Sequence, residues 1–176
     1  MSNDLYQASV PQFLRMLANL KGILEKAAAH AAAKKIEESA FLDARLFPDM
    51  FPLTTQVRIA SDFARGTSAR LSGTEPPKIE DNEKSFAELI ARVDEAIAYV
   101  RGLPASAFAG AAERTVTRKI RGADRTFSGS DYLYQFALPN FYFHLTTAYA
   151  LLRHNGVAVG KRDYLGTLTQ KAAPAT

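Results

Sequence analysis

The sequence predicts an all-α fold, a four-helix bundle with a small β-hairpin inserted before the last helix. Four long segments carry an apolar residue at every third or fourth position, which is the pattern of a helix with one buried face. Stretches rich in proline, glycine and charge separate these segments. The composition, 47% hydrophobic and 23% charged, is that of an ordinary globular chain. Because such helices bury their apolar faces only against one another, a bundle is favoured.

A chain of 176 residues is expected to form one domain with a single core. We assign this domain to residues 1–166 and a loose tail to residues 167–176. The N-terminus has no signal-peptide pattern, and no apolar run approaches ~18 residues, so a cytoplasmic protein without a membrane span is expected. The absence of cysteine excludes disulfides and thiolate chemistry.

The first helix is predicted to begin at a Ser9 cap, with Pro11 in its first turn. Its expected end is near Lys34 or Lys35, where a cation suits the negative end of the helix dipole. His30, in the alanine-rich last part, lies beside the apolar stripe and is expected to be solvated or half-buried. The stripe consists of Phe13, Met16, Leu17, Leu20, Leu24 and Ala27.

Residues 46–53, LFPDMFPL, are predicted to form a rigid apolar connector, because two prolines oppose a continuous helix. Such a segment is usually folded under an edge of the core, but it can also line a pocket or a partner surface. Pro52 then opens a second long helix that runs to about Leu71. The expected inner face of this helix consists of Leu53, Val57, Ala60, Phe63 and Ala64.

A polar loop is expected between the second and third helices, because this segment contains glycine, two prolines and mixed charge. Asp81 or Asn82 is predicted to cap the third helix. Glu83 would then lie in its first turn, and Gly102 would end it. The stripe of this helix consists of Phe86, Leu89, Ile90, Val93, Ile97 and Val100.

Residues 114–127 alternate between apolar and polar side chains around a predicted Gly122-Ala123-Asp124 turn, which is typical of a β-hairpin. Val116, Arg118 and Ile120 are expected on one face. The segment is also basic, and nucleic acid or an anionic ligand could use its cations. Because stacked aromatic side chains are missing, nucleic-acid binding is not expected. The cations are Arg114, Arg118, Lys119, Arg121 and Arg125.

The last helix is predicted from about Ser130 to Gly156, in the most aromatic part of the chain. Pro139 is expected to kink or break it. The helix holds His144 and His154, ten residues apart. On one helix this spacing separates them by about 80° around the axis and about 15 Å along it, so they cannot bind the same ion.

A metal site at His144 would need ligands from other helices. One turn before it lies Asn140, a poor zinc ligand, and one turn after it lies an alanine. Carboxylates such as Asp49 or Asp62 would have to complete the site. The alternative is a buried histidine hydrogen-bonded to Asn140, Gln56 or a tyrosine. No nucleophile elbow or glycine-rich phosphate loop is present, so no catalytic residue is assigned.

Three segments closely resemble a bacterial family of unknown function in the DinB-like superfamily: LYQASVPQFLRMLANLKGIL, LFPDMFPLTTQV and LPNFYFHLTTAYALLRHNGV. The resemblance covers about residues 4–166. It implies a four-helix bundle of DinB-like topology, often dimeric. Better-known members of the superfamily resemble metal-dependent enzymes, including thiol-dependent transferases and isomerases, and bind a divalent ion through three histidines.

Only His144 matches that histidine pattern, so no metal or other cofactor is expected. We expect a pocket at the superfamily's metal position, which binds a small molecule or is vestigial. The alternative is a metal-dependent hydrolase or thiol-type transferase that uses His144 with carboxylate ligands. The resemblance and the apolar connector together predict a homodimer. The candidate pocket residues are Asp49, Gln56, Asn140, Tyr142 and His144, with Met50 and Phe51 as an apolar wall.

Overall fold

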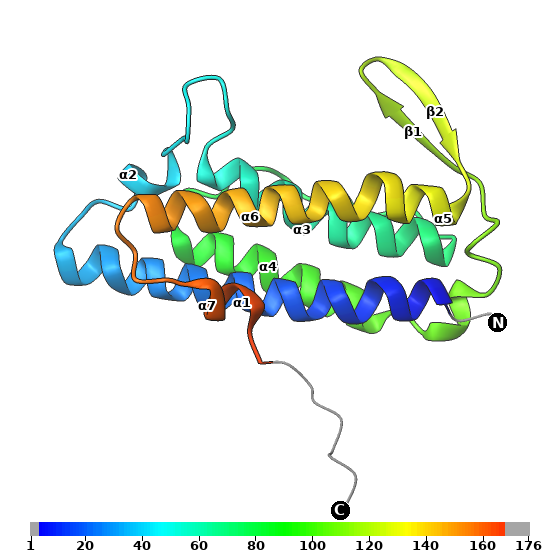
Figure 1. Ribbon diagram of the computed structural model, residues 1–176, viewed down its shortest axis with the longest axis horizontal. Helices are drawn as coiled ribbons and strands as arrows, with labels where there is room; N and C mark the ends of the chain where they lie inside the picture. Colours follow the sequence, from blue (N-terminus) through cyan, green and yellow to red (C-terminus); the bar gives the residue numbers. More distant parts are fainter. Residues whose placement is uncertain (1–3, 168–176) are drawn as a thin grey trace, which may run out of the picture.

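Four long helices form an elongated bundle in the computed structural model, which describes residues 4–167 (Figure 1). They are α1 (Asp4–Lys34), α3 (Leu53–Ser72), α4 (Phe86–Gly102) and α6 (Leu138–His154). The shorter elements are α2 (Ser39–Leu42), the 3-10 turn η1 (Ala105–Phe108), strands β1 (Val116–Ile120) and β2 (Ala123–Phe127), α5 (Gly129–Asp131), the π-helical η2 (Tyr132–Ala137) and α7 (Lys161–Leu165). The predicted fold class, a helical bundle with a hairpin before the last helix, is confirmed.

The core is built from the apolar stripes of the long helices. α1 packs mainly on α4, and α3 packs on both α6 and α4. Every residue assigned to a stripe from the sequence is buried except Phe63 and Ile90, which are half-buried. Apolar periodicity therefore identified the buried face of each of these helices correctly.

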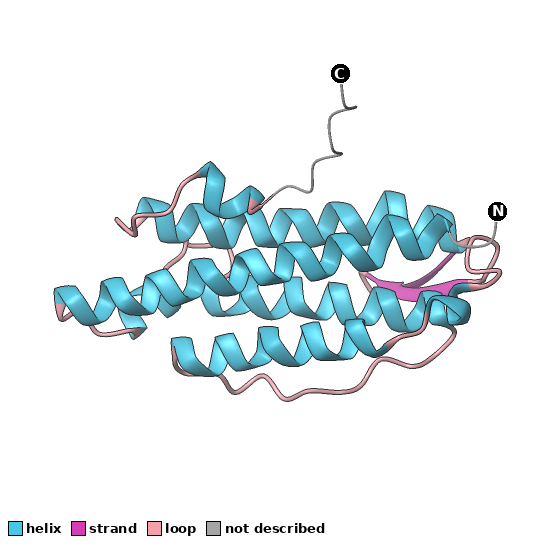
Figure 2. Ribbon diagram, turned by 90° about the horizontal axis from the view of Figure 1, so that it is seen from below, coloured by secondary structure: helices cyan, strands magenta, loops and turns pink. Residues whose placement is uncertain are grey.

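α3 and α4 run in the same direction, and α1 and α6 run in the opposite one (Figure 1). The segment of residues 73–85 makes this arrangement possible, because it travels back along the length of the bundle before α4 begins (Figure 2). The segment consequently lies beside the helices instead of closing a tight turn.

The predicted start of the first helix is wrong. α1 begins at Asp4, so Ser9 lies inside the helix, where it is buried and its hydroxyl donates to the carbonyl of Leu5 at 2.5 Å. Serine satisfies its hydroxyl in this way within a helix as readily as it caps one. The end of α1 at Lys34 agrees with the prediction.

The predicted cap of the third helix is also wrong. α4 is capped by Ser85, whose side chain accepts a hydrogen bond from the backbone N–H of Glu88 at 3.2 Å. Asp81 and Asn82 lie before this cap on the long segment. Glu83 is buried in an ion-pair network instead of lying in a first helical turn.

The hairpin turn consists of Arg121 and Gly122, one residue earlier than predicted. Both residues have positive φ, 51° and 81°, as a two-residue hairpin turn requires. Ala123 pairs with Ile120, so it belongs to β2 and not to the turn. On β1, Val116 is buried and Arg118 and Ile120 are half-buried, whereas Thr117 and Lys119 are exposed. The three residues predicted to share a face do so, and the structure shows that this face points inward.

Pro139 neither kinks nor breaks the last helix visibly, since α5, η2 and α6 form one continuous rod (Figure 1). Instead, the residues before the proline wind as a π-helix, in which the N–H of Leu138 donates to the carbonyl of Leu133. Proline removes one donor from the regular ladder. The predicted kink or break at Pro139 is therefore wrong, and a π-helical segment precedes the proline instead.

α7 lies against α1, where the side-chain amide of Asn19 donates to the carbonyl of Tyr164 at 2.9 Å. Residues 168–176, most of the predicted tail, lie outside the described residues. Within residues 4–167, no helix is long and apolar enough to cross a membrane.

Candidate functional site

His144 on α6 and Gln56 on α3, two of the predicted pocket residues, lie opposite each other where these helices pack together. His144 is 8% exposed and Gln56 is 1% exposed. Nδ1 of His144 lies 2.7 Å from Oε1 of Gln56, and Nε2 of Gln56 donates to the carbonyl of Phe51 at 3.1 Å. Of the partners expected for a buried His144, the structure selects Gln56.

This chain of hydrogen bonds determines the tautomer of His144. The carbonyl of Phe51 can only accept, so the Gln56 amide turns its NH2 group toward it and its oxygen toward His144. Nδ1 of the neutral imidazole therefore carries the proton. Burial lowers the pKa of His144 below its ordinary value of 6.5, which favours this neutral form.

Aromatic rings enclose the imidazole. Phe63 of α3 stacks on it with a centroid distance of 6.3 Å and an interplanar angle of 16°. Phe143 approaches it edge-on at 5.2 Å. His144 is thus surrounded by rings and an amide, with no charged group among these partners.

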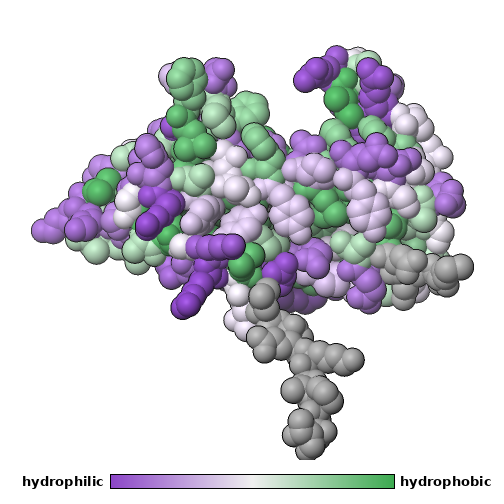
Figure 3. Space-filling view, viewed as in Figure 1, coloured by the Kyte–Doolittle hydropathy of each residue, from purple (hydrophilic) through white to green (hydrophobic). Residues whose placement is uncertain are grey.

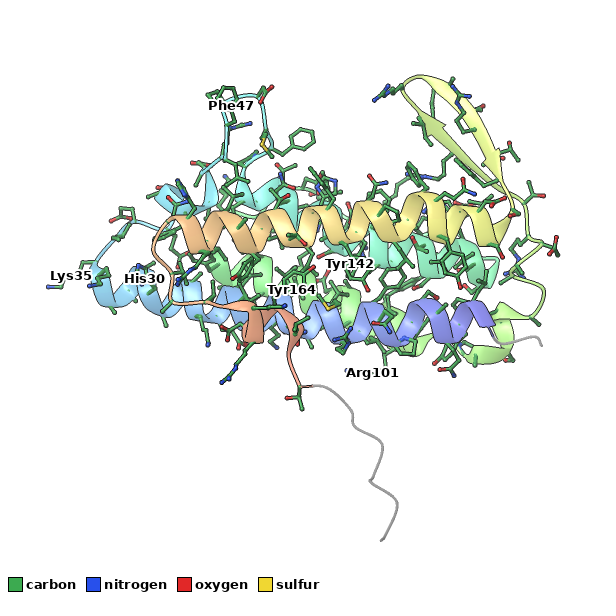
Figure 4. The ribbon with its side chains drawn as sticks, viewed as in Figure 1. His30, Lys35, Phe47, Arg101, Tyr142 and Tyr164 are labelled. Carbon is green, nitrogen blue, oxygen red and sulfur yellow. The ribbon has the colours of Figure 1, made fainter. Side chains whose placement is uncertain are left out.

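The other predicted pocket residues lie elsewhere. Asp49 and the side chain of Phe51 are exposed on the loop between α2 and α3, with Met50 half-buried beside them. The side-chain amide of Asn140 donates to the carbonyl one turn earlier, at 2.7 Å. Tyr142 lies between α6 and α1, where burial raises its pKa (Figure 4). The structure therefore brings together Gln56, His144 and the backbone of Phe51 only.

A different hollow lies between α3, β1 and the start of the long segment before α4. It consists of three neighbouring cavities of about 680, 500 and 210 Å³, and both Arg70 and Arg118 line all three. We call it the hairpin groove. The side chains that define it here are Arg65, Arg70, Arg114, Arg118, Ile59, Phe63 and Tyr132.

Sequence reasoning missed the groove residues of α3. Arg118 was expected on the same hairpin face as Val116 and Ile120, among cations that an anionic ligand could use, but Arg65 and Arg70 belong to no motif. The sequence offered one signal: Arg65 directly follows Ala64, which was assigned to the inner face of its helix. In the structure this helix packs on two others. A cation so placed is rarely buried without a special reason.

A buried ion-pair network holds one wall of the groove in place. Arg92 of α4 is 3% exposed and donates to Glu83 at 2.7 Å and to Asp62 at 2.9 Å. Glu83 also accepts from Arg58 at 2.5 Å. Burial alone would raise the pKa of Glu83, but the hydrogen bonds from Arg92 and Arg58 outweigh it and lower that pKa. The network attaches the long segment to α3 and α4.

Comparison with known families identifies the chain. The family model described as Domain of unknown function (DUF1993) matches residues 5–165. The chain belongs to this family. A crystal structure of a DinB family member protein from Shewanella denitrificans is similar, with 43% identity, 96% of each chain covered and a TM-score of 0.90. The predicted resemblance to a DinB-like family of unknown function is thereby confirmed. Comparison with the curated proteins gives no match.

In this DUF1993 protein the residues around His144 do not fit a divalent metal. Within residues 4–167, no three His, Asp or Glu side chains come together as an ion would require. Asp62, considered from the sequence as a carboxylate ligand, is bound by Arg65 and Arg92. Nδ1 of His144 is occupied by Gln56. This donor set supplies a single imidazole and no carboxylate.

Proposed function

We propose that this protein binds a small molecule in the hairpin groove and does so without a metal. The observation that supports this most directly is that three neighbouring cavities of about 210 to 680 Å³ share Arg70 and Arg118 as lining residues. The two larger cavities each have the volume of an ordinary ligand pocket, about 300–1,000 Å³.

The chemistry of the groove suits a ligand. Ile59, Phe63 and Tyr132 provide apolar surface in the smallest cavity, and Arg70 and Arg118 stand beside them. Ligand pockets typically combine an apolar lining with a small number of polar groups that orient the bound molecule.

Phe63 connects the groove with the predicted pocket. Its ring lines the smallest cavity and also stacks on the imidazole of His144. His144 and Gln56 would accordingly support the groove from behind, and a ligand that moves the ring of Phe63 would change the surroundings of His144.

Fragment screening of the isotope-labelled full chain by NMR tests the proposal. Fragments that bind at ~1 mM should shift the amide signals of residues 59–70 and 115–118 and the ring signals of His144. Tyr142, on the α1 side of α6, serves as the internal control and should not shift. Shifts confined to other surfaces, or a complete lack of binding, would refute the groove as the ligand site.

Elemental analysis tests the absence of a metal. Protein purified without added metal should carry far less than a stoichiometric amount, because His144 has no second metal-binding side chain beside it. A stoichiometric metal that disappears in His144→Ala would overturn this part of the proposal. It would favour a metal-dependent hydrolase or thiol-type transferase instead.

We also propose that two copies associate through the loop between α2 and α3. Three apolar side chains of this loop are strongly exposed, Leu46 at 41%, Phe47 at 64% and Phe51 at 54%. The loop forms an apolar projection on the surface (Figure 3). A second copy that covered it would remove these side chains from water, and exposed apolar patches often mark such contacts.

A further inference from the structure

We infer that the ligand of the hairpin groove is a small organic anion with an apolar body. This inference rests on the proposed function and adds the chemical class of the ligand. A carboxylate or phosphate group would bind to the arginine cluster, which we define as Arg65, Arg70 and Arg118. The body would pack on the apolar floor, defined as Ile59, Phe63 and Tyr132.

Arg65 is the first reason for an anion. It is 4% exposed, and within residues 4–167 its side chain bonds to Asp62 alone, which accepts from Nη2 at 2.5 Å. Nε and Nη1 of Arg65 are buried and have no partner in the described part of the chain. The same Asp62 oxygen also accepts from Arg92 at 2.9 Å, so it is shared. A buried guanidinium normally has its donors satisfied. Because Arg65 lines the cavity of about 500 Å³, the partner that we infer for it is an anion bound there.

Arg70 and Arg118 are the second reason. Neither forms an ion pair within residues 4–167, and Nε of Arg118 is buried without a partner. Burial and the nearby positive charge of Arg70 both lower the pKa of Arg118. Two cations held together in this way repel each other. An anion bound between them would be attracted to both cations and would offset their repulsion.

Gly66 shows how Arg70 reaches its position. A Cβ atom at residue 66 would lie 2.5 Å from Nη1 of Arg70, so the guanidinium occupies the space that the missing side chain leaves. Glycine is unfavourable inside a helix. Here it lets Arg70 fold back along α3 toward the groove.

The groove as a whole has more positive than negative charge. Two carboxylates, Asp62 and Glu75, line it, and Asp62 is already paired with Arg65 and Arg92. The cations that line it are Arg65, Arg70, Lys78, Arg114 and Arg118. This surplus of positive charge favours an anionic ligand.

The test is an NMR titration of the full chain with four probes. Benzoate and phenyl phosphate carry a ring and an anionic group, benzamide is a neutral analogue of benzoate, and acetate lacks the ring. At least one of the two ring-bearing anions should bind about tenfold more tightly than benzamide and acetate. Benzamide loses the charge-assisted hydrogen bonds, and acetate loses the apolar contact. The Nε–Hε signals of Arg65 and Arg118 should shift with the anions.

Two variants locate the binding. Arg118→Gln should weaken the tighter-binding anion about tenfold without weakening benzamide. Gly66→Ala keeps every charge and favours the helix, but its methyl group displaces the guanidinium of Arg70, so it should weaken the anion as well. The control Arg101→Gln makes the same charge change at an exposed site on α4, at the opposite edge of the bundle from the hairpin, and should leave affinity unchanged (Figure 4).

Two results would overturn the inference. One is benzamide binding in the groove as tightly as both ring-bearing anions, which would leave the proposed function intact and remove only the anionic class. The other is an affinity for the anions that neither Arg118→Gln nor Gly66→Ala changes. If no probe and no screening fragment binds in the groove, the proposed function itself is wrong.

Discussion

Burial disfavours the charged form of His144 in the folded protein and so lowers the pKa of its imidazole. In the unfolded chain the same side chain is in water and binds a proton at its ordinary pKa. The difference between the two states makes the stability of the protein depend on pH.

Stability should therefore fall as the pH drops below about 6.5, because the unfolded chain then takes up a proton that the folded chain does not. The loss ends once the pH passes the lower pKa of the folded state, and its slope is at most about 1.4 kcal/mol per pH unit. Urea denaturation between about pH 5 and 7 measures it. His144→Asn should flatten the slope, whereas His154→Asn should keep it because His144 is intact. An unchanged slope in His144→Asn would contradict the assignment.

Glu83 shows the same sign in a lower pH range. Hydrogen bonds from Arg92 and Arg58 lower its pKa, so its contribution is present above its ordinary value of 4.5 and is lost as the pH falls through the lower pKa of the folded state. Glu83→Gln should cost about 2 kcal/mol near neutral pH, because it removes the most buried of the carboxylates that accept from Arg92, together with the carboxylate that accepts from Arg58. The control is Asp94→Asn, which breaks an exposed pair with Lys21 and should have little effect. Equal losses in urea denaturation would show that the network contributes no more than a surface pair.

At the scale of elements, the start of the last helical rod is held tightly against the segment after η1. The N–H of Ser130 donates to the carbonyl of Ala112 at 3.1 Å. A Cβ atom on Gly129 would overlap the carbonyl oxygen of Ala111, which is backbone and cannot turn away. Glycine at this position lets the hairpin join α5 at close range.

Gly129→Ala should accordingly destabilise the protein by at least about 2 kcal/mol. The matched control is Gly22→Ala in α1, where an added Cβ atom has no neighbour within 4 Å. This second change should stabilise the protein by about 1 kcal/mol, because alanine favours a helix and nothing is displaced. Both values come from urea denaturation, and effects of the same sign would contradict the packing described here.

At the scale of the whole molecule, the proposed dimer predicts a mass near twice the 19.3 kDa of one chain in light scattering. Replacing both Phe47 and Phe51 by serine should give the mass of a single chain, because it removes the most exposed apolar side chains of the loop. Tyr134→Ser changes another exposed ring, 53% accessible on η2, and should keep the wild-type mass. A monomeric wild-type protein would refute the dimer.

Local patterns predicted the elements well and their ends poorly. The periodicity of α4 identified Phe86 as part of a buried face, but capping rules placed its start at Asp81 or Asn82. Asp, Asn and Ser are all good caps, so sequence alone could not choose Ser85. The hairpin was found, yet its turn was placed one residue late, because both Arg121 and Gly122 adopt the positive φ that glycine alone was expected to supply.

By itself, the sequence determined the four long helices, the hairpin and the family, since apolar periodicity, turn residues and the three segments that resemble the family are properties of neighbouring positions. Only the tertiary structure decided which distant side chains meet. His144 contacts Gln56, which lies 88 positions away in the sequence, whereas Tyr142, two residues from His144, lies toward α1. Arg70 and Arg118 came to line one groove from different elements. Such pairings follow from the packing of whole helices and from the path of the long segment, which no local pattern encodes.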